Sequence, residues 1–212
     1  LAERVGRAYA TYGVKRGVKT ISLGRDGRLS SPSLHKALLK GLLAGGLDVI
    51  DIGICTSPLV YFSLFTLPVG GGIMITGSHN AAEYNGFKIC VGKSAIHGED
   101  IQELRRVMEA GVFVSGNGRL SEHPIIPDYL AYLQKSFSHV HANRLHVVID
   151  SGNGAASLVA KQALHGWQDR RGPGVWVPMT VDPVNDLVFI PLGNATDQNY
   201  GNSRPGENLY AT

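Results

Sequence analysis

The feature that most constrains the fold is a regular alternation of strand-like and helix-like runs over the first 165 residues. Three short apolar runs predict strands, at residues 18–23, 49–52 and 71–75. Between the first two runs, Leu34, Leu38 and Leu42 recur at the spacing of one helix face. The strand-like runs show no clean polar alternation, which is typical of strands covered on both faces. The pattern therefore predicts an α/β fold with a parallel or mixed sheet.

Proline and glycine mark the expected ends of the helices. Pro32 and Pro58 each follow a serine and predict helix starts, and Gly45 predicts the end of the first helix. Later runs predict three more helices, around residues 100–109, 129–133 and 158–164. A further strand is predicted at residues 145–150. A second strand-helix unit is expected to begin near residue 127, with Pro124 and Pro127 as a hinge.

Composition excludes several classes of protein. With 43% hydrophobic and 17% charged residues, the chain of 212 residues is globular and not disordered. A formal net charge of +3 gives no case for nucleic acid or a membrane surface as partner. There is no signal-peptide pattern and no apolar run of membrane-spanning length. Cys55 and Cys90 are too few for a disulfide framework and predict buried thiols in a cytoplasmic protein.

The sequence changes character near residue 165. Lys161 is the last lysine, whereas both tryptophans and half of the ten prolines follow it. Apolar runs at 175–178 and 187–191, separated by turn residues, predict short antiparallel strands. We therefore expect a β-rich segment over 166–212, attached to α/β sequence.

The segment with the most chemical information follows the predicted strand 71–75. Gly77 permits a tight turn beside Ser78, His79 is placed to orient the serine hydroxyl, and Lys88 supplies a cation from the next strand. The alternative is a polar turn, since Asn85-Gly86 is a hairpin signal in its own right. A serine hydrolase is disfavoured because the G-x-S-x-G pattern is absent. A serine that carries phosphate fits the neighbouring charges better.

Several motifs together resemble the α-D-phosphohexomutases, in particular the bacterial phosphomannomutase/phosphoglucomutase branch. Thr-Gly-Ser-His-Asn at 76–80, with Tyr-Asn-Gly-Phe-Lys at 84–88, is similar to the phosphoserine loop of that family. Gly-Arg-Asp-Gly-Arg at 24–28 and Thr-Ser-Pro at 56–58 extend the resemblance. The run at 147–154 resembles the start of the family's second domain. The resemblance implies a three-layer αβα domain I over 1–125, without its opening strand, and the start of domain II over 126–165.

The resemblance also implies a mechanism. Ser78 would carry a phosphoryl group, donate it to a hexose 1- or 6-phosphate, and recover one from the hexose 1,6-bisphosphate. His79 and Lys88 match active-site positions, with Lys88 as the candidate for proton transfer, and Asn80 matches a substrate-binding position. Mg²⁺ would neutralise the transferring group, with the phosphate on Ser78 as one ligand. Mannose is the first expected sugar and glucose the second.

Some family features have no counterpart in this sequence. No run matches the Asp-rich metal loop of domain II, and Asp182, Asp186 and Asp197 are spaced wrongly for it. Arg25 and Arg28 belong to a turn motif and are expected to be structural. The opening strand would lie before Leu1, and the third and fourth domains are not matched. We therefore expect little or no mutase turnover from this polypeptide by itself.

The β-rich segment has a resemblance of its own. Residues 175–183, 187–194 and 201–210 resemble a propeller blade of quinoprotein glucose dehydrogenases, which bind pyrroloquinoline quinone inside a full ring of blades. One blade cannot enclose that cofactor, because blades bury their faces against neighbours. Two alternatives to a mutase therefore stay open, an inactive chimeric polypeptide and a fragment of a quinone-dependent dehydrogenase. The sequence does not define an oligomeric state.

Overall fold

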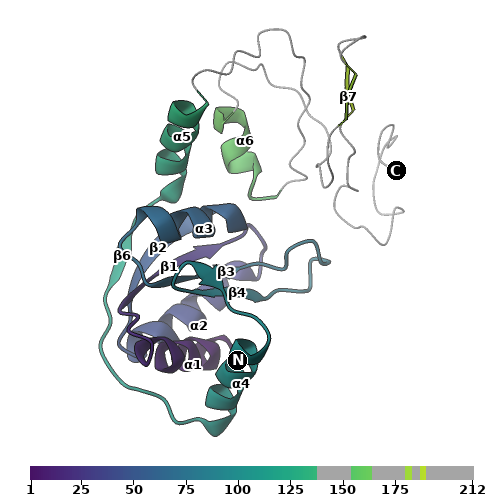
Figure 1. Cartoon of the computed structure of the whole chain (residues 1–212). Coiled ribbons are helices and arrows are strands. Elements are labelled where there is room, and N and C mark those ends of the chain that lie inside the picture. Colours follow the sequence, from purple (N-terminus) through teal and green to yellow (C-terminus); the bar gives the residue numbers. More distant parts are fainter. Residues whose placement is uncertain (138–153, 164–179, 183–186, 190–212) are drawn as a thin grey trace. The chain divides into compact units, whose positions relative to one another are not determined.

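The computed structural model describes residues 1–137, 154–163, 180–182 and 187–189 (Figure 1). The chain divides into two compact units, Leu1–Tyr129 and Leu130–Thr212. The first unit holds the six-stranded sheet and its covering helices, and it contains the serine loop singled out above.

The sheet of the first unit is mixed, as the sequence predicts. Its strands are β1 (Thr20–Arg25), β2 (Asp48–Ile54), β3 (Gly71–Ile75), β4 (Phe87–Val91), β5 (Ser94–Ala95) and β6 (Leu120–Glu122). They are arranged in the order β5-β4-β3-β1-β2-β6. β3, β1, β2 and β6 run parallel, β4 pairs antiparallel with β3, and β5 pairs antiparallel with β4. The carboxyl ends of β1, β2 and β3 therefore lie at one edge of the sheet.

Helices cover both faces of this sheet and make three layers. The helices are α1 (Ala2–Val14), α2 (Ser31–Ala44), α3 (Ser57–Thr66) and α4 (Glu99–Ala110), followed by α5 (Ile125–Ser136). α1, α2 and α4 lie on one side and α3 lies on the other (Figure 1). α2 connects β1 to β2 on one face of the sheet, and α3 connects β2 to β3 on the other face. β2 and β3 therefore lie on opposite sides of β1, and the strand order changes direction beside β1. Open α/β sheets bind ligands at such a point.

α1 and α2 pack closely because glycines face each other between them. A Cβ built on Gly6 would lie 2.4 Å from the carbonyl oxygen of Leu38, and one built on Gly41 would lie 2.1 Å from that of Glu3. The approach brings Tyr9 of α1 fully into the core, where its hydroxyl donates to the carbonyl oxygen of Cys90 at 2.8 Å. The helical layer is thereby fixed to the sheet.

The boundaries of the elements agree in part with the sequence predictions. α2 begins at Ser31 and ends before Gly45, and β3 spans residues 71–75, as predicted. The strand predicted at 18–23 instead begins at Thr20, because the N–H of Val18 donates to the carbonyl of Gly13 and closes the end of α1. α1 itself was not predicted from the sequence.

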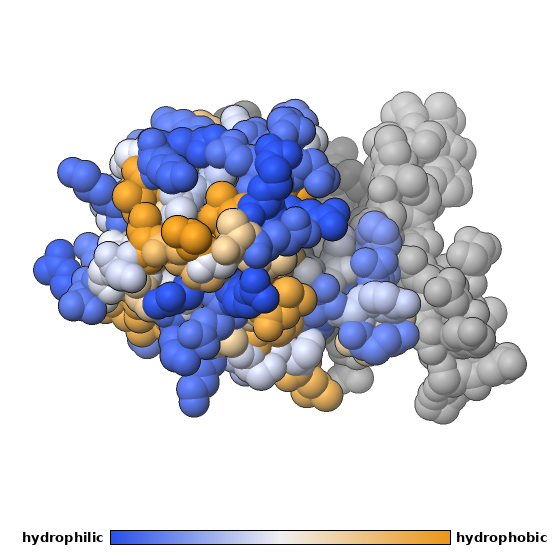
Figure 2. Space-filling view, turned by 90° about the horizontal axis from the view of Figure 1, so that it is seen from below, coloured by the Kyte–Doolittle hydropathy of each residue, from blue (hydrophilic) through white to orange (hydrophobic). Residues whose placement is uncertain are grey.

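Ion pairs cover the outer side of α1 and α4. Arg16, which follows the end of α1, pairs with Glu103 of α4 at 2.8 Å, and Arg105 pairs with Glu109 within α4. Hydrophilic side chains dominate the view from below, with apolar groups gathered in smaller patches among them (Figure 2). Exposed pairs of this kind contribute little to stability.

The described part of the second unit contains three short elements besides the end of α5. These are α6 (Ser157–Ala163), β7 (Thr180–Asp182) and β8 (Leu187–Phe189), of which β7 and β8 pair antiparallel. α6 begins one residue before the predicted helix 158–164 and otherwise overlaps it. The strands predicted at 145–150 and 175–178 lie outside the described residues. None of the helices in the described ranges combines the length and apolar character needed to cross a bilayer.

Candidate active site

The candidate site lies where β1 and β3 end side by side. The residue after β1, Asp26, donates its backbone N–H to the carbonyl oxygen of Ile75, the last residue of β3, at 2.9 Å. The loop that follows β3 returns to the sheet at β4, and Gly86 closes it by accepting the N–H of Thr76 at 3.0 Å. Two motifs some fifty residues apart in sequence therefore meet at the carboxyl edge of the sheet.

Ser78 is exposed at the tip of this loop in a strained backbone conformation. Its φ of 55° makes it the one non-glycine residue with positive φ in the part of the chain that the structure describes. Its N–H donates to the hydroxyl of Thr76 at 2.9 Å, and its Oγ lies 3.3 Å from Nδ1 of His79. Strained residues of this kind persist where surrounding contacts hold them, and they cluster at functional sites.

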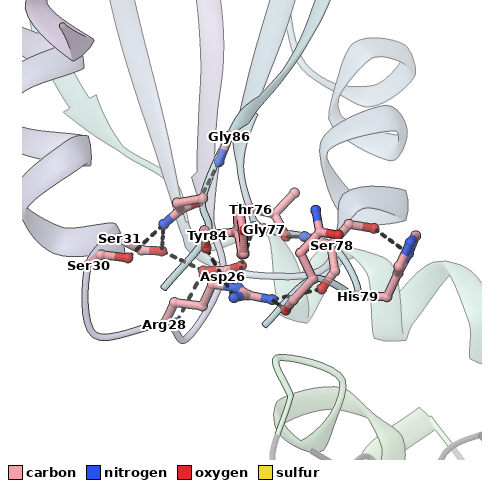
Figure 3. Close-up of polar contacts among 12 residues, drawn as sticks. Asp26, Arg28, Ser30, Ser31, Thr76, Gly77, Ser78, His79, Tyr84 and Gly86 are labelled. Carbon is pink, nitrogen blue, oxygen red and sulfur yellow. Dashed lines mark hydrogen bonds and ion pairs between the residues drawn. The ribbon is translucent and has the colours of Figure 1, made fainter. Parts of the chain in front are cut away.

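Arg28 holds the inner side of the loop (Figure 3). One terminal nitrogen of its guanidinium donates to the carbonyl oxygens of Ala81 and Tyr84, at 2.6 and 3.1 Å. The other terminal nitrogen donates to those of Ser78 and Asn80, at 3.1 and 2.6 Å. A single side chain thus binds four carbonyl groups of the serine loop, while the Ser78 hydroxyl points toward His79.

Asp26 orients Arg28 in turn. One carboxylate oxygen of Asp26 lies 3.3 Å from Nε of Arg28 and also accepts the N–H of Gly77 at 3.3 Å. The other oxygen accepts the hydroxyl of Ser31 at 2.5 Å and the N–H of Arg28 at 3.1 Å. Asn85 completes the group by donating to Ser31 Oγ at 3.1 Å. The turn after β1 and the loop after β3 form one hydrogen-bonded network.

The structure brings some of the predicted site residues together. Ser78 and His79 are in contact, and Asn80 belongs to the same loop, where its N–H donates to the carbonyl of Gly77 at 3.0 Å. Lys88 lies half-buried on β4, paired in register with Met74 of β3. It makes no hydrogen bond or ion pair among the described residues. The site roles of these four residues remain predictions.

The remaining candidates named in the sequence have structural surroundings where they are described. Cys55 and Cys90 are free and fully buried; burial raises the pKa of Cys55 to about 12 and also raises that of Cys90. Both thiols therefore pack in the core, as predicted. Asp182 lies on β7, whereas Asp186 and Asp197 are outside the described residues. Over the described ranges, no three His, Cys, Asp or Glu side chains come together as a metal site.

The sequence does not show how the site is held. Arg28 is expected from its motif to be structural, and the structure does give this arginine a structural contact, but with the serine loop itself. Asp26, Ser31 and Asn85 were quoted only as parts of motifs. The position of the two motifs in the sequence could have indicated their contact, since both follow strands that end at the same edge of a parallel sheet.

Fold and site together define an α/β domain that presents one exposed serine at the ligand-binding edge of its sheet. The family model described as "Phosphoglucomutase/phosphomannomutase, alpha/beta/alpha domain I" matches residues 1–114. That range covers more than half of the chain and includes the whole serine loop. The chain therefore belongs to the phosphoglucomutase/phosphomannomutase family.

Individual relatives agree with this assignment. The phosphomannomutase/phosphoglucomutase of Pseudomonas aeruginosa is 38% identical over 160 residues, which cover 76% of this chain and 34% of that protein. The phosphoglucomutase of Neisseria gonorrhoeae is 39% identical over 165 residues, 76% of this chain and 35% of that protein. This chain thus spans about a third of the length of the curated relatives it matches.

A solved structure shares the fold. The crystal structure of a phosphoglucomutase/phosphomannomutase family protein from Burkholderia thailandensis superposes with a TM-score of 0.69 at 34% identity, covering 75% of this chain and 36% of that one. The three-layer αβα class expected from the sequence is confirmed.

A second family model matches the C-terminal part. It is described as "Glucose/ethanol/alcohol dehydrogenase, beta-propeller domain" and covers residues 151–212. The resemblance of the tail to a quinoprotein propeller is therefore confirmed at the level of sequence. Its match begins before residue 166, the expected start of the β-rich segment.

Proposed function

We propose that these residues form the phosphoserine-carrying part of a phosphohexomutase, with Ser78 as the residue that carries the phosphoryl group. One observation supports this proposal most strongly. Ser78 is exposed and strained, and its loop is fixed at the carboxyl edge of the sheet by hydrogen bonds to Arg28 and Asp26. A nucleophile needs this kind of fixed presentation, because correct orientation lowers the barrier to reaction.

In the proposed reaction, the phosphoryl group passes from Ser78 to a hydroxyl of a hexose phosphate. The bond from phosphorus to Ser78 Oγ breaks as a bond to the sugar oxygen forms. The proton of the sugar hydroxyl passes to the amine of Lys88, and Ser78 Oγ regains a proton, for which the ring of His79, 3.3 Å away, is placed. The reverse step recharges Ser78 from the hexose 1,6-bisphosphate, with Asn80 contacting the sugar phosphate.

Mg²⁺ is proposed to bind through the phosphate on Ser78. This ion takes oxygen ligands, chiefly carboxylates and phosphates. In the described ranges no cluster of acidic or imidazole side chains forms a cage for it, and the Asp26 carboxylate is occupied by the donors of Arg28, Ser31 and Gly77. The described residues do not hold the ion by themselves, and no step above is derived through it.

The proposed substrates follow from the family. The relatives are named phosphomannomutases and phosphoglucomutases, so we propose hexose 6-phosphate and hexose 1-phosphate, with mannose before glucose. We also propose a cytoplasmic location, in keeping with the two free thiols. By themselves, these residues are proposed to exchange a phosphoryl group at Ser78 with little complete turnover, because they match only about a third of the length of the relatives.

Uptake of phosphate tests this proposal. The chain is incubated with glucose 1,6-bisphosphate and Mg²⁺, and its intact mass and peptides are measured. The expected result is a gain of one phosphoryl group on Ser78 and none in Ser78→Ala. Phosphate on other residues, or none at all, contradicts the proposal.

A second candidate function is favoured by the propeller match over 151–212. On that hypothesis the segment derives from a quinone-dependent glucose dehydrogenase, and the chain joins two unrelated proteins. Glucose-dependent dye reduction after addition of pyrroloquinoline quinone and Ca²⁺ tests for the dehydrogenase. Sequencing source DNA across the codons for residues 155–175 tests whether the junction is natural.

A further inference from the structure

We propose that Arg28 is a positioning residue for phosphoryl transfer at Ser78: it fixes the serine loop by its carbonyl groups and so keeps the hydroxyl of Ser78 directed outward. This inference rests on the function proposed for Ser78. Arg28 contacts the carbonyl oxygen of Ser78 and not its hydroxyl, so its effect on the reaction passes through the backbone of the loop.

The backbone of Ser78 needs such a support. A φ of 55° is unfavourable for a residue with a side chain. Local hydrogen bonds contribute, since the Ser78 N–H donates to Thr76 Oγ1, but this contact spans only two residues. The bond from Arg28 to the Ser78 carbonyl comes from outside the loop, from a turn anchored on the neighbouring strand. It therefore fixes the peptide group that follows the strained residue.

The charge of Arg28 also suits a loop that will carry phosphate. The carbonyl oxygens of Ser78, Asn80, Ala81 and Tyr84 are all bound by its guanidinium. In the trans peptides of this chain, each N–H points opposite to the preceding carbonyl, so the N–H groups of Ala81 and Ala82 are turned away from Arg28. With its carbonyls directed inward, the loop turns its negative dipole ends away from the side where phosphate would sit.

Lysine cannot replace this arginine. The four carbonyls are reached by two nitrogens of one planar group, while Nε faces Asp26. An ammonium group offers three donors from a single atom and lacks the planar fork. Arg28→Lys therefore keeps the charge but loses the geometry, which separates positioning from simple electrostatic attraction.

The test compares Arg28→Lys with Arg105→Lys, a substitution at an exposed arginine of α4. The rate of Ser78 phosphorylation by glucose 1,6-bisphosphate is measured, together with amide hydrogen exchange. We expect Arg28→Lys to lower the rate about ten- to a hundredfold, as small misplacements of reacting groups do. Exchange should rise at residues 76–86 and stay unchanged in β1 and β2. Arg105→Lys should match the unmodified chain in both measurements.

Chemical rescue adds a readout that a purely structural role would not move. Ethylguanidinium added to Arg28→Ala should restore part of the phosphorylation rate, and ethylammonium should not. A rate in Arg28→Lys equal to that of the unmodified chain would overturn the proposal, as would unchanged exchange in the loop. If Arg28→Lys does not fold, the comparison is made on Arg28→Gln, whose phosphorylation rate is measured with ethylguanidinium and with ethylammonium. Absence of phosphate uptake by the unmodified chain contradicts the proposed function instead, and the exchange data then decide alone whether Arg28 orders the loop.

Discussion

Gly77 leaves the space that the guanidinium of Arg28 occupies. A Cβ built on Gly77 would lie 2.5 Å from Cζ and 2.6 Å from Nε of Arg28, and 2.7 Å from the carbonyl oxygen of Tyr84. The backbone N–H of Gly77 also donates to Asp26, the partner of Arg28. The glycine that precedes the candidate phosphoserine is therefore required by close packing and not by its backbone angles.

Gly77→Ala should push Arg28 out of the loop. We expect the free energy of unfolding to fall by about 1–3 kcal/mol, as for overpacked sites in general. The rate of Ser78 phosphorylation should fall with it, because the loop loses its anchor. Urea denaturation and phosphate uptake measure the two effects. The control is Gly27→Ala, since a Cβ there meets nothing within 4 Å; equal behaviour of the two variants would contradict this reading.

Asp26→Asn should weaken the network while leaving its shape largely intact. Asp26 is nearly buried and accepts from Ser31, Gly77 and Arg28. Loss of its charge beside Arg28 should lower the free energy of unfolding by about 1–3 kcal/mol. Thermal denaturation measures this. The exposed pair of Asp128 with His123 provides a control, for which Asp128→Asn should cost less than about 1 kcal/mol.

Lys88→Met should impair phosphoryl transfer without unfolding the chain. If Lys88 moves the sugar proton, discharge of phosphorylated Ser78 to a hexose phosphate should slow by about a hundredfold or more. The apolar stem of methionine keeps the packing on β4. Lys36→Met on the exposed side of α2 is the matched control. Rapid discharge in Lys88→Met would remove this lysine from the mechanism.

The stability of the fold should depend on pH through Asp51. Burial alone would raise the pKa of Asp51, but the imidazole of His35, the N–H of Gly53 and the charge of Arg25 outweigh it and lower the pKa. Nε2 of His35 lies 2.9 Å from Oδ2 of Asp51. Since the pKa is lower in the folded state, the ionised carboxylate stabilises the fold.

This stabilisation is present above the pKa that Asp51 has in the unfolded chain. It is lost as the pH falls below about 4 and through the folded pKa. In urea denaturation at a series of pH values, Asp51→Asn should flatten this part of the stability profile. Glu83→Gln, at an exposed side chain, should leave the profile as it is. An unchanged profile in Asp51→Asn would show that this carboxylate does not carry the effect.

Sequence patterns predicted the central layers of the fold because their signals are local. The helix at 31–44 has a proline at its start and a glycine after its end, and β3 begins with two glycines and continues with three apolar residues. α1 was missed because many of its buried residues are Ala, Gly and Thr, so its packing depends on glycine contacts with α2 that no local pattern reveals. The short edge strands β5 and β6 are exposed and carry little apolar signal.

The site, too, has residues that the sequence predicts and contacts that it does not. Ser78, His79 and Asn80 were found from one contiguous motif, and the structure places Ser78 and His79 in contact. The contact between Arg28 and the loop could not be derived from spacing, because it joins backbone carbonyls to a side chain fifty residues earlier. Carbonyl acceptors belong to every residue, so the sequence does not show which of them an arginine will bind.

Discharge of the phosphorylated chain tests the central claim most directly. Ser78 is first phosphorylated with glucose 1,6-bisphosphate, the reagent is removed, and mannose 1-phosphate or glucose 6-phosphate is added. Phosphate on Ser78 and hexose bisphosphate in solution are then followed by mass spectrometry and phosphorus NMR. The account predicts that phosphate leaves Ser78 as an equal amount of hexose bisphosphate forms. Phosphate that stays on Ser78, or that is released as inorganic phosphate, would contradict it.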